Sequence, residues 1–471
     1  TAFNYEFFRH STSPSYAPPD TVASISRDGL SLPMEMDDPL LHIQPFTKRQ
    51  RRVALYLAVF SFFVLVPLII FYSRGYSIDL KNRSLFRSGG IFVKTNQTSF
   101  RLLINNQVAR ETSFISYGAL VTDLKPDLYL VRIEKEGFRT WQRFIHVEAE
   151  SVSEFRHIFL VPEKLAEKEI LDISRRNLSI SEFEILPGSP WLFMRTKEKS
   201  AITYLFNRDT KIFDAVEAFD DFRWDAASRR LLVKRASPSR FALIPLASGR
   251  LQKEEPLRFP KELGQVKIAD FFGANDFLVL GSDGRLSRLK RGSGAVTPLS
   301  QDVHSFAISG SRILFVTQSG FFSSADFRGE NVENYGRKGF FLSDAPVKMV
   351  TNGSGDYFLI DSAGGFFVKR RSEPEAIPFA GKVEGAEFTR QGDKLLFWSG
   401  SGAEVLWLEE EPHQPFRKAG ERERVLSLGD QVFEMVSWLG PLEENVIFKA
   451  GSFVGIVDID NRGGGPATTL L

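Results

Sequence analysis

The sequence predicts an all-β protein, in which a small antiparallel β-sandwich and a β-propeller of about seven blades follow one transmembrane helix. Three observations predict this fold class. An uncharged, apolar run extends from Val53 to Tyr72. From Gly90 to Pro162, apolar and polar residues alternate in short segments, as they do in half-buried strands. Beyond Glu163, a block of two apolar strands joined by a polar turn recurs seven times, which is typical of repeat folds.

The composition excludes several classes of function. The chain has 471 residues, 43% hydrophobic and 25% charged, which is ordinary for a globular protein of two or three domains. Lys and Arg number 60 against 58 Asp and Glu, so the net charge gives no reason to expect a nucleic-acid partner. Because the sequence has no cysteine, disulfides, thiolate catalysis and cysteine-ligated metals are excluded.

The first predicted element is a transmembrane helix with a basic flank, residues 47–74. The run "VALYLAVFSFFVLVPLIIFY" (Val53–Tyr72) has the ~20 residues that a helix needs to cross a bilayer. Pro67 lies where a membrane helix tolerates it. A buried core helix is the alternative, but the run has no polar face. A cleaved signal peptide would have a shorter apolar core and a small-residue cleavage site.

The flanking charges predict the orientation of this helix. "KRQRR" (Lys48–Arg52) abuts its N-terminal end, and the positive-inside rule keeps such a cluster in the cytoplasm. Basic residues are as numerous within about 15 positions on the other side, but they are scattered and open a long domain. We therefore expect an uncleaved signal anchor, single-pass in the cell membrane, with extracytoplasmic C-terminal domains. Residues 1–46, rich in Pro, Ser and acids, are expected to form a disordered cytoplasmic tail.

Residues 75–163 are predicted to form the sandwich. "GIFVKTN" begins a series of about five short strands, and Asn105-Asn106 supplies a hairpin turn, because asparagine tolerates left-handed backbone. In "YLVRIEKEGF", Tyr129, Val131 and Ile133 share one face of a strand. Five antiparallel strands in about 70 residues indicate a small β-sandwich.

The segment "LVTDLKPDLYLVRIEKEGFRTWQRFIHV" resembles the signature of the PEGA domain, in which a leucine, a Pro-Gly turn, a Y-x-V strand, a Gly-aromatic turn and a tryptophan recur in this order. Two features depart from it: the turn is Pro126-Asp127, and "NQTS" (Asn96–Ser99) replaces the name-giving tetrapeptide. The resemblance implies a non-catalytic surface β-domain of the bacterial envelope, which binds envelope components or serves as a spacer. The matching residues are Leu124, Pro126, Tyr129, Val131, Gly137, Phe138 and Trp141.

Two aromatic residues of this segment, Phe138 and Trp141, are the candidate ligand-stacking residues. Aromatic rings bind the apolar faces of sugars, so the pair can be read as a carbohydrate platform. The alternative, which we favour, is that both rings cover the core of a small sandwich that is short of hydrophobic volume.

Residues 164–471 are predicted to form the propeller. The first strands of the seven blocks start between 36 residues (Phe277 to Ile313) and 51 residues (Leu395 to Val446) apart, the period of four-stranded blades. Six or eight blades remain alternatives. "GAEFTRQGDK" resembles the strand-turn-strand of TolB-like and WD40-like blades. The blocks start near Leu192, Leu231, Phe277, Ile313, Phe358, Leu395 and Val446.

The ends of this domain are candidates for closing the ring. A propeller often completes one blade with strands from both ends of the domain. "EKEILDI" (Glu167–Ile173) and "PATTLL" (Pro466–Leu471) lie at those ends. We expect the C-terminal segment to pair with a strand from the opposite end.

Sequence motifs for catalysis or for cofactor and metal binding are not found. The six histidines lack metal-ligand spacing, and no GxSxG, Walker A or GxGxxG motif occurs. "DIDNRGGG" (Asp458–Gly465) has Arg462 where a calcium ligand should stand, so we interpret it as a blade turn. We therefore expect no cofactor and no enzymatic activity. A propeller hydrolase would use carboxylates of the channel, for which Asp225, Asp361 and Glu387 are the candidates.

The expected function is that of a membrane-anchored, extracytoplasmic binding and scaffold protein. Its propeller would present a broad face to an envelope protein or an envelope glycan. The alternatives are a structural component of an envelope array and, less favoured, a propeller hydrolase. Fold analogy alone names neither the ligand nor the oligomeric state.

Overall fold

The computed structural model describes residues 47–73, 75–79, 84–164, 171, 178, 180–186, 188–196, 202–235, 240–246, 251–273, 276–337, 342–343, 347–400, 402–429, 431–440, 443–464 and 468–469. The expected tail, residues 1–46, lies outside these ranges, as does most of Glu167–Ile173. By the density of its contacts, the chain divides into two units, residues 1–68 and 69–471. Each unit is described by itself.

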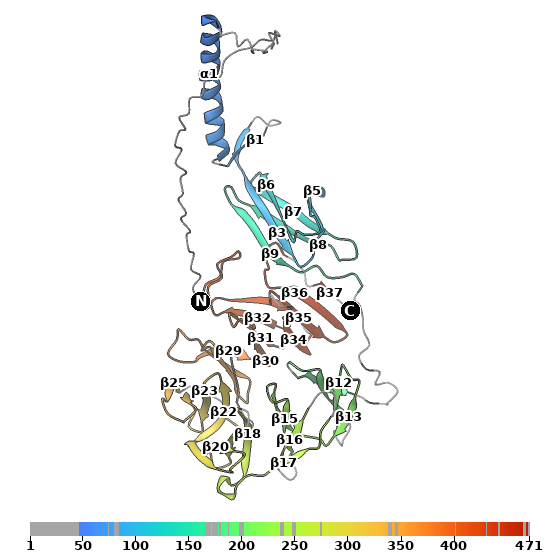
Figure 1. Ribbon diagram of the computed structural model, residues 1–471, viewed down its shortest axis with the longest axis vertical. Helices are drawn as coiled ribbons and strands as arrows, with labels where there is room; N and C mark the ends of the chain where they lie inside the picture. The colour runs from blue at the N-terminus through green and yellow to red at the C-terminus, as the bar shows by residue number, and fades with distance from the viewer. Residues whose placement is uncertain are drawn as a thin grey trace, which may run out of the picture. The chain divides into compact units, whose positions relative to one another are not determined.

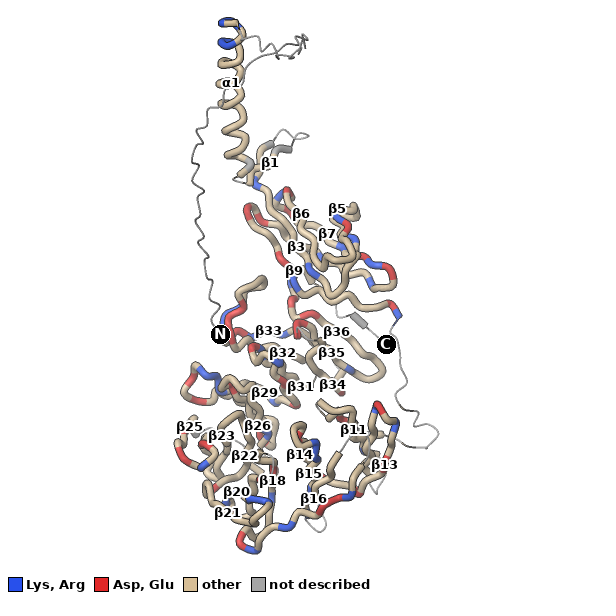
Figure 2. Tube along the Cα trace, in the orientation of Figure 1, with Lys and Arg blue, Asp and Glu red and all other residues tan. Residues whose placement is uncertain are grey.

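The helix α1 (Lys48–Ser73) contains the predicted apolar run. A capping box begins it: the Thr47 amide donates to Gln50 Oε1 (2.9 Å), and the Gln50 amide donates to Thr47 Oγ1 (3.4 Å), so two otherwise unpaired amides find acceptors. Lys and Arg occupy its start and apolar residues the remainder (Figure 2). None of Lys48–Phe71 is buried, and its most apolar 18-residue window has a mean hydropathy of 2.7, so α1 is long and apolar enough to cross a membrane.

Seven strands form the sandwich, in two sheets of order β5-β4-β7-β8 and β6-β3-β9 (Figure 1). The predicted hairpin is confirmed, with φ of 49° at Asn105 and 65° at Asn106. The sandwich is antiparallel, as expected, except that β3 and β9 pair in parallel. A short hairpin of β1 (Tyr76–Asp79) and β2 (Ser84–Arg87) precedes the sandwich. The sandwich strands are β3 (Gly89–Thr95), β4 (Arg101–Ile104), β5 (Gln107–Glu111), β6 (Gly118–Leu124), β7 (Asp127–Glu134), β8 (Trp141–Val147) and β9 (Val152–Ile158).

The core of the sandwich comes from the inward-facing residues of both sheets. Ile91 and Val93 of β3 oppose Val131 and Ile133 of β7, and all four are fully buried. Tyr129 packs at the margin of this core, so the predicted apolar face of β7 is confirmed.

Beyond residue 179, the described strands form seven four-stranded sheets in sequence order, here called blade 1 to blade 7. This number is consistent with the expected propeller of about seven blades. Each predicted block is the middle strand pair of one blade. The blades are β10 (Ile180–Ile185), β11 (Trp191–Thr196), β12 (Thr203–Asn207), β13 (Phe213–Val216); β14 (Asp221–Asp225), β15 (Arg230–Arg235), β16 (Arg240–Pro245), β17 (Glu255–Leu257); β18 (Val266–Phe272), β19 (Asp276–Gly281), β20 (Leu286–Lys290), β21 (Val296–Ser300); β22 (Val303–Ser309), β23 (Arg312–Thr317), β24 (Phe321–Asp326), β25 (Glu333–Arg337); β26 (Lys348–Thr351), β27 (Tyr357–Ile360), β28 (Gly365–Lys369), β29 (Ile377–Lys382); β30 (Gly385–Phe388), β31 (Lys394–Ser399), β32 (Gly402–Trp407), β33 (Arg422–Ser427); and β34 (Met435–Leu439), β35 (Asn445–Ala450), β36 (Phe453–Asp458), β37 (Thr468–Thr469).

Phenylalanines fill the spaces between consecutive blades. Phe193 of blade 1 lies edge-on to Phe222 of blade 2, with ring centroids 4.6 Å apart. The rings of Phe358 of blade 5 and Phe388 of blade 6 are tilted by 42°, with centroids 5.3 Å apart. Such offset and edge-on aromatic pairs add to the free energy of area burial. Stacking of apolar sheet faces therefore explains why this chain needs so many phenylalanines.

The expectation for ring closure is wrong at the C-terminus. Thr468–Thr469 forms β37, as its strand-like sequence predicts, but it pairs with β36 of the same blade. All four strands of blade 7 are therefore consecutive in sequence. Of Glu167–Ile173, the structure describes only Leu171, which packs against the buried Leu192, Met194 and Phe206 of blade 1.

Candidate functional site

The two candidate stacking residues lie in different surroundings. Phe138 is half-buried at the margin of the sandwich core, with Lys135 Nζ 5.6 Å from its ring centroid. Trp141 begins β8 and packs edge-on against Phe155 at 5.8 Å. The Arg143 guanidinium carbon lies 5.4 Å from the Trp141 ring centroid. Trp141, unlike Phe138, is therefore close to a polar network that joins the sandwich to blades 6 and 7.

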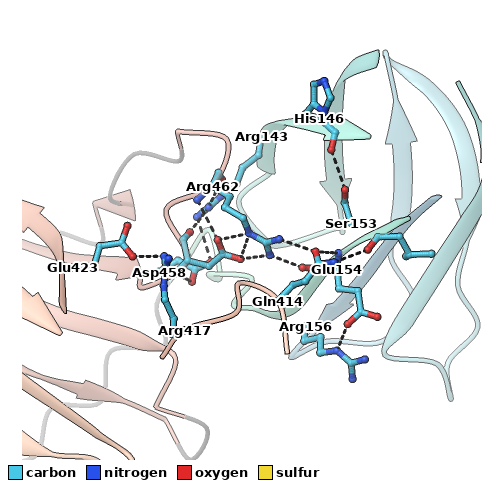
Figure 3. A network of polar contacts seen from close by, with 12 residues as sticks. Arg143, His146, Ser153, Glu154, Arg156, Gln414, Arg417, Glu423, Asp458 and Arg462 are labelled. Atoms are coloured by element: carbon cyan, nitrogen blue, oxygen red, sulfur yellow. Dashed lines mark hydrogen bonds and ion pairs between the residues drawn. The ribbon is translucent and has the colours of Figure 1, made fainter. Parts of the chain in front are cut away.

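Arg143 is the sandwich residue at the centre of this network, which we call the joint (Figure 3). Alternation along β8 places Arg143 on the same face as the buried Ile145 and Val147, so its guanidinium is only 4% exposed. Nη1 donates to the carbonyl oxygens of Asp460 and Arg462 (2.7 Å for Arg462), and Nη2 lies 3.3 Å from Asp458 Oδ2. A buried cation needs such partners.

Arg462 reaches in the opposite direction, from the loop after β36 to the sandwich. Its guanidinium carbon lies 4.3 Å from the ring centroid of Phe155, within range of a cation–π interaction. Nη2 donates to the Glu154 carbonyl at 2.5 Å, and Nε donates to Asp460 Oδ1 at 2.9 Å. Arg462 thus holds its own loop while binding β9. The segment Asp458–Gly465 connects β36 to β37, so the prediction of a blade turn is confirmed. Arg462 forms an ion pair with Asp460 of this turn.

Gln414, in the loop between β32 and β33, binds the backbone of β9 as a neighbouring strand would. Its Oε1 accepts from the Glu154 amide at 3.1 Å, and its Nε2 donates to the Val152 carbonyl at 3.0 Å. Arg462 Nη1 donates to the same Oε1 at 3.0 Å. Because β9 pairs with a described strand on one side only, this amide covers backbone groups at a sheet edge.

Buried ionisable groups lie beside the joint. Burial raises the pKa of Asp458 to about 7, against the opposing effect of Arg143. Burial also raises the pKa of Glu444 to about 7, although Lys394 Nζ lies 2.8 Å from its carboxylate. Burial, with the nearby Lys394, lowers the pKa of His157 to about 4. His157 is therefore neutral at pH 7, while the two carboxyls are partly protonated there.

A pocket of about 390 Å³ adjoins the joint, between the sandwich and blade 7. The sandwich contributes Trp141 and Phe144 to it, and blade 7 contributes Asn445, Ile456 and Asp458. Its volume lies in the range of small-molecule sites.

The three carboxylates considered for catalysis belong to three different blades. Asp225 ends β14 and accepts from the amides of Ala227 and Ser228. Asp361 accepts from the amides of Ala363 (2.9 Å) and Gly365 (2.7 Å). Both therefore stabilise turns of their own blades. Glu387 lies in β30 of blade 6, where burial raises its pKa. In the part of the chain that the structure describes, no group of three His, Asp or Glu side chains is placed to hold a metal ion.

The network has no signal in local motifs, because its partners are far apart in sequence. Arg143 and Asp458 are separated by 315 positions, and Glu154 and Gln414 by 260. One feature of the sequence could have indicated Arg143. In "WQRFIHV", it occupies a position that alternation assigns to the buried, apolar face of β8. A charged residue in that phase indicates a buried partner.

Neither a family model nor a curated protein matches the chain. Solved structures that it resembles include Hsv2 of Kluyveromyces lactis, at 10% identity and a TM-score of 0.42, covering 62% of this chain and 98% of that one. The β-propeller domain of Myceliophteria thermophila Cps50 (Swd1) shares 11% identity at a TM-score of 0.40, covering 63% and 99%. Dihydro-heme d1 dehydrogenase NirN shares 12% identity at 0.43, covering 62% and 66%. At these values, the similarities say nothing about function.

Proposed function

We propose that the chain is a membrane-anchored, extracytoplasmic binding and scaffold protein of the cell envelope, in which a PEGA-like sandwich holds a β-propeller away from the membrane. The apolar surface of α1 carries this proposal. None of its window Lys48–Phe71 is buried against other described residues, and exposure of so large an apolar surface to water is unfavourable. A bilayer covers it. The basic start of α1 remains in the cytoplasm.

The joint supports the role of the sandwich as a spacer. A flexible linker would leave the propeller free to move, whereas Arg143, Gln414 and Arg462 bind it to β8 and β9 of the sandwich. A propeller fixed in this way presents the same surface, in the same orientation to the sandwich, to its partner. The partner proposed is an envelope protein or glycan, and no reaction is proposed, because Asp225 and Asp361 serve their own turns.

Labelling of single cysteines tests the proposed topology directly, because the chain has no native cysteine. Ser293→Cys lies in an exposed turn of blade 3, and Ser11→Cys lies in the N-terminal segment. A membrane-impermeant maleimide added to intact cells should label Ser293→Cys only, and lysis should make both reactive. Labelling of Ser11→Cys alone would reverse the orientation, and labelling of neither would place the propeller inside the cell.

A further inference from the structure

The pocket beside the joint is built by both modules. Gly463 of blade 7 has a φ of +73°, and a Cβ there would lie 2.4 Å from the Phe144 carbonyl oxygen and 3.2 Å from Arg143 Cβ. The loop thus lies directly against β8, and only a glycine permits that approach. Because Phe144 and Gly463 both line the pocket, the site is complete only when the modules are docked.

The pocket wall combines aromatic rings with both hydrogen-bond donors and acceptors. Phe144 is 56% exposed on one face of β8, and Trp141 is half-buried on the other face. Gln142, on the same face as Phe144, is exposed. Further polar residues of the wall are Arg132, Arg143, Asn445 and Asp458.

Two donors of this wall lack acceptors. The Nε atoms of Arg132 and Arg143 are buried and have no hydrogen-bond partner among the residues that the structure describes. Arg132 Nη1 is occupied by Asn106 Oδ1 at 2.9 Å, so the missing acceptor is specific to Nε. A buried donor without a partner is unfavourable, and an oxygen atom of a ligand in the pocket would supply the missing acceptor.

The polar and aromatic residues of the wall favour a neutral, hydroxyl-bearing ligand over an apolar or an anionic one. A purely apolar ligand would leave these donors unpaired. Both arginines of the wall already have ion-pair partners, Arg143 with Asp458 and Arg132 with Glu134, so neither is a free cation for a phosphate or carboxylate. Hydroxyl groups both donate and accept, and the C–H faces of a sugar ring pack against aromatic side chains. We propose that this pocket binds a short segment of a neutral saccharide. The inference rests on the proposed function and identifies the glycan as its partner.

A matched pair of phenylalanine variants tests the site. Phe144→Ala removes an aromatic wall of the pocket, whereas Phe114→Ala removes a ring that is 80% exposed elsewhere on the sandwich. The full chain, in phospholipid nanodiscs free of glycoside detergents, is titrated with trisaccharides of N-acetylglucosamine, glucose and mannose, and with a galacturonate trisaccharide. Saturation-transfer NMR reports binding.

We expect saturable binding of at least one neutral trisaccharide, weakened about fivefold by Phe144→Ala and unchanged by Phe114→Ala. Gly463→Ala should abolish binding by opening the joint. Gly451→Ala is the control, because Gly451 also has a positive φ in blade 7 but its Cβ would meet no atom within 4 Å, and this variant should retain most of the binding. The proposal is overturned if no neutral trisaccharide binds or if the protein prefers the galacturonate trisaccharide. It is also overturned if the two phenylalanine variants weaken binding equally. The cysteine-labelling result is independent, so the display function can stand if this site fails.

Discussion

Arg143 lies on the face of β8 that alternation reserves for apolar side chains, beside Ile145. Its ion pair with Asp458 connects two strands that belong to different modules. Pairs of this kind contribute little relative to apolar packing, but removal of one partner leaves the other charge buried and unpaired. Arg143 is therefore the residue whose loss should affect the joint most.

Replacement of Arg143 by alanine should lower the free energy of unfolding by about 2–3 kcal/mol, because the carbonyl oxygens of Asp460 and Arg462 lose their buried donor and Asp458 loses its ion pair. Urea denaturation followed by tryptophan fluorescence measures the loss. Arg101→Ala is the matched control, because Arg101 pairs with Glu134 at 3.2 Å on the surface and should cost less than about 1 kcal/mol. Equal, small losses in both variants would show that Arg143 does not hold the joint.

The stability of the joint should fall as the pH rises from about 6.5 to 8.5. The folded state holds the pKa of Asp458 and of Glu444 at about 7, above the ordinary values of 3.8 and 4.5. Folding therefore favours their protonated forms, and that stabilisation is lost as the pH rises through 7. His157 does not mask the effect, because its lowered pKa reduces stability only below its ordinary value of 6.5.

Urea midpoints measured across this window test the prediction. Glu444→Gln removes one of the two titrating groups, so its midpoint should depend less steeply on pH than that of the parent. A parent midpoint that rises between pH 6.5 and 8.5 contradicts the assignment.

At the scale of elements, the middle strands of each blade were predictable because both of their faces are buried. Leu278, Val279 and Leu280 of β19 are almost fully buried, and such strands read as continuous apolar runs. The fourth strands of the first six blades were not predicted. β17, for example, has the sequence "EPL" with two exposed residues. Short, polar edge strands leave no hydrophobic pattern.

Non-local pairing could not be predicted from pattern alone. The parallel register of β3 and β9, in which Ile91 is opposite Ser153, joins segments that both show ordinary alternation. The same limit explains the wrong expectation for β37. Its residues show that a strand forms, but only the geometry of blade 7 determines that the partner is β36.

Deletion of Thr468–Leu471 should have a modest effect, because β37 contributes only two paired positions, Gly455–Thr469 and Ile456–Thr468. We expect a loss of about 1 kcal/mol, with the protein remaining monodisperse. Thermal unfolding and size-exclusion chromatography measure both. A large loss with aggregation would show that these residues close the ring after all.

At the scale of the whole molecule, the joint covers two free sheet edges of the sandwich. β8 and β9 are terminal strands of their sheets, and Gly463 and Gln414 lie against them. Uncovered edges invite pairing with other chains, so docking of the propeller both protects the sandwich and fixes its own orientation. A saccharide bound beside the joint would stabilise the docked state further.

The joint should make the sandwich and the propeller move as one rigid body. Double electron–electron resonance in the full chain in nanodiscs measures this, between spin labels at Glu111→Cys on β5 and Ser293→Cys on blade 3. Both positions are exposed, and the sequence has no cysteine that would interfere. We expect a single narrow distance distribution that broadens when Arg143→Ala is added. A distribution that is already broad in the parent, and unchanged by Arg143→Ala, would show that the joint does not hold the two modules together.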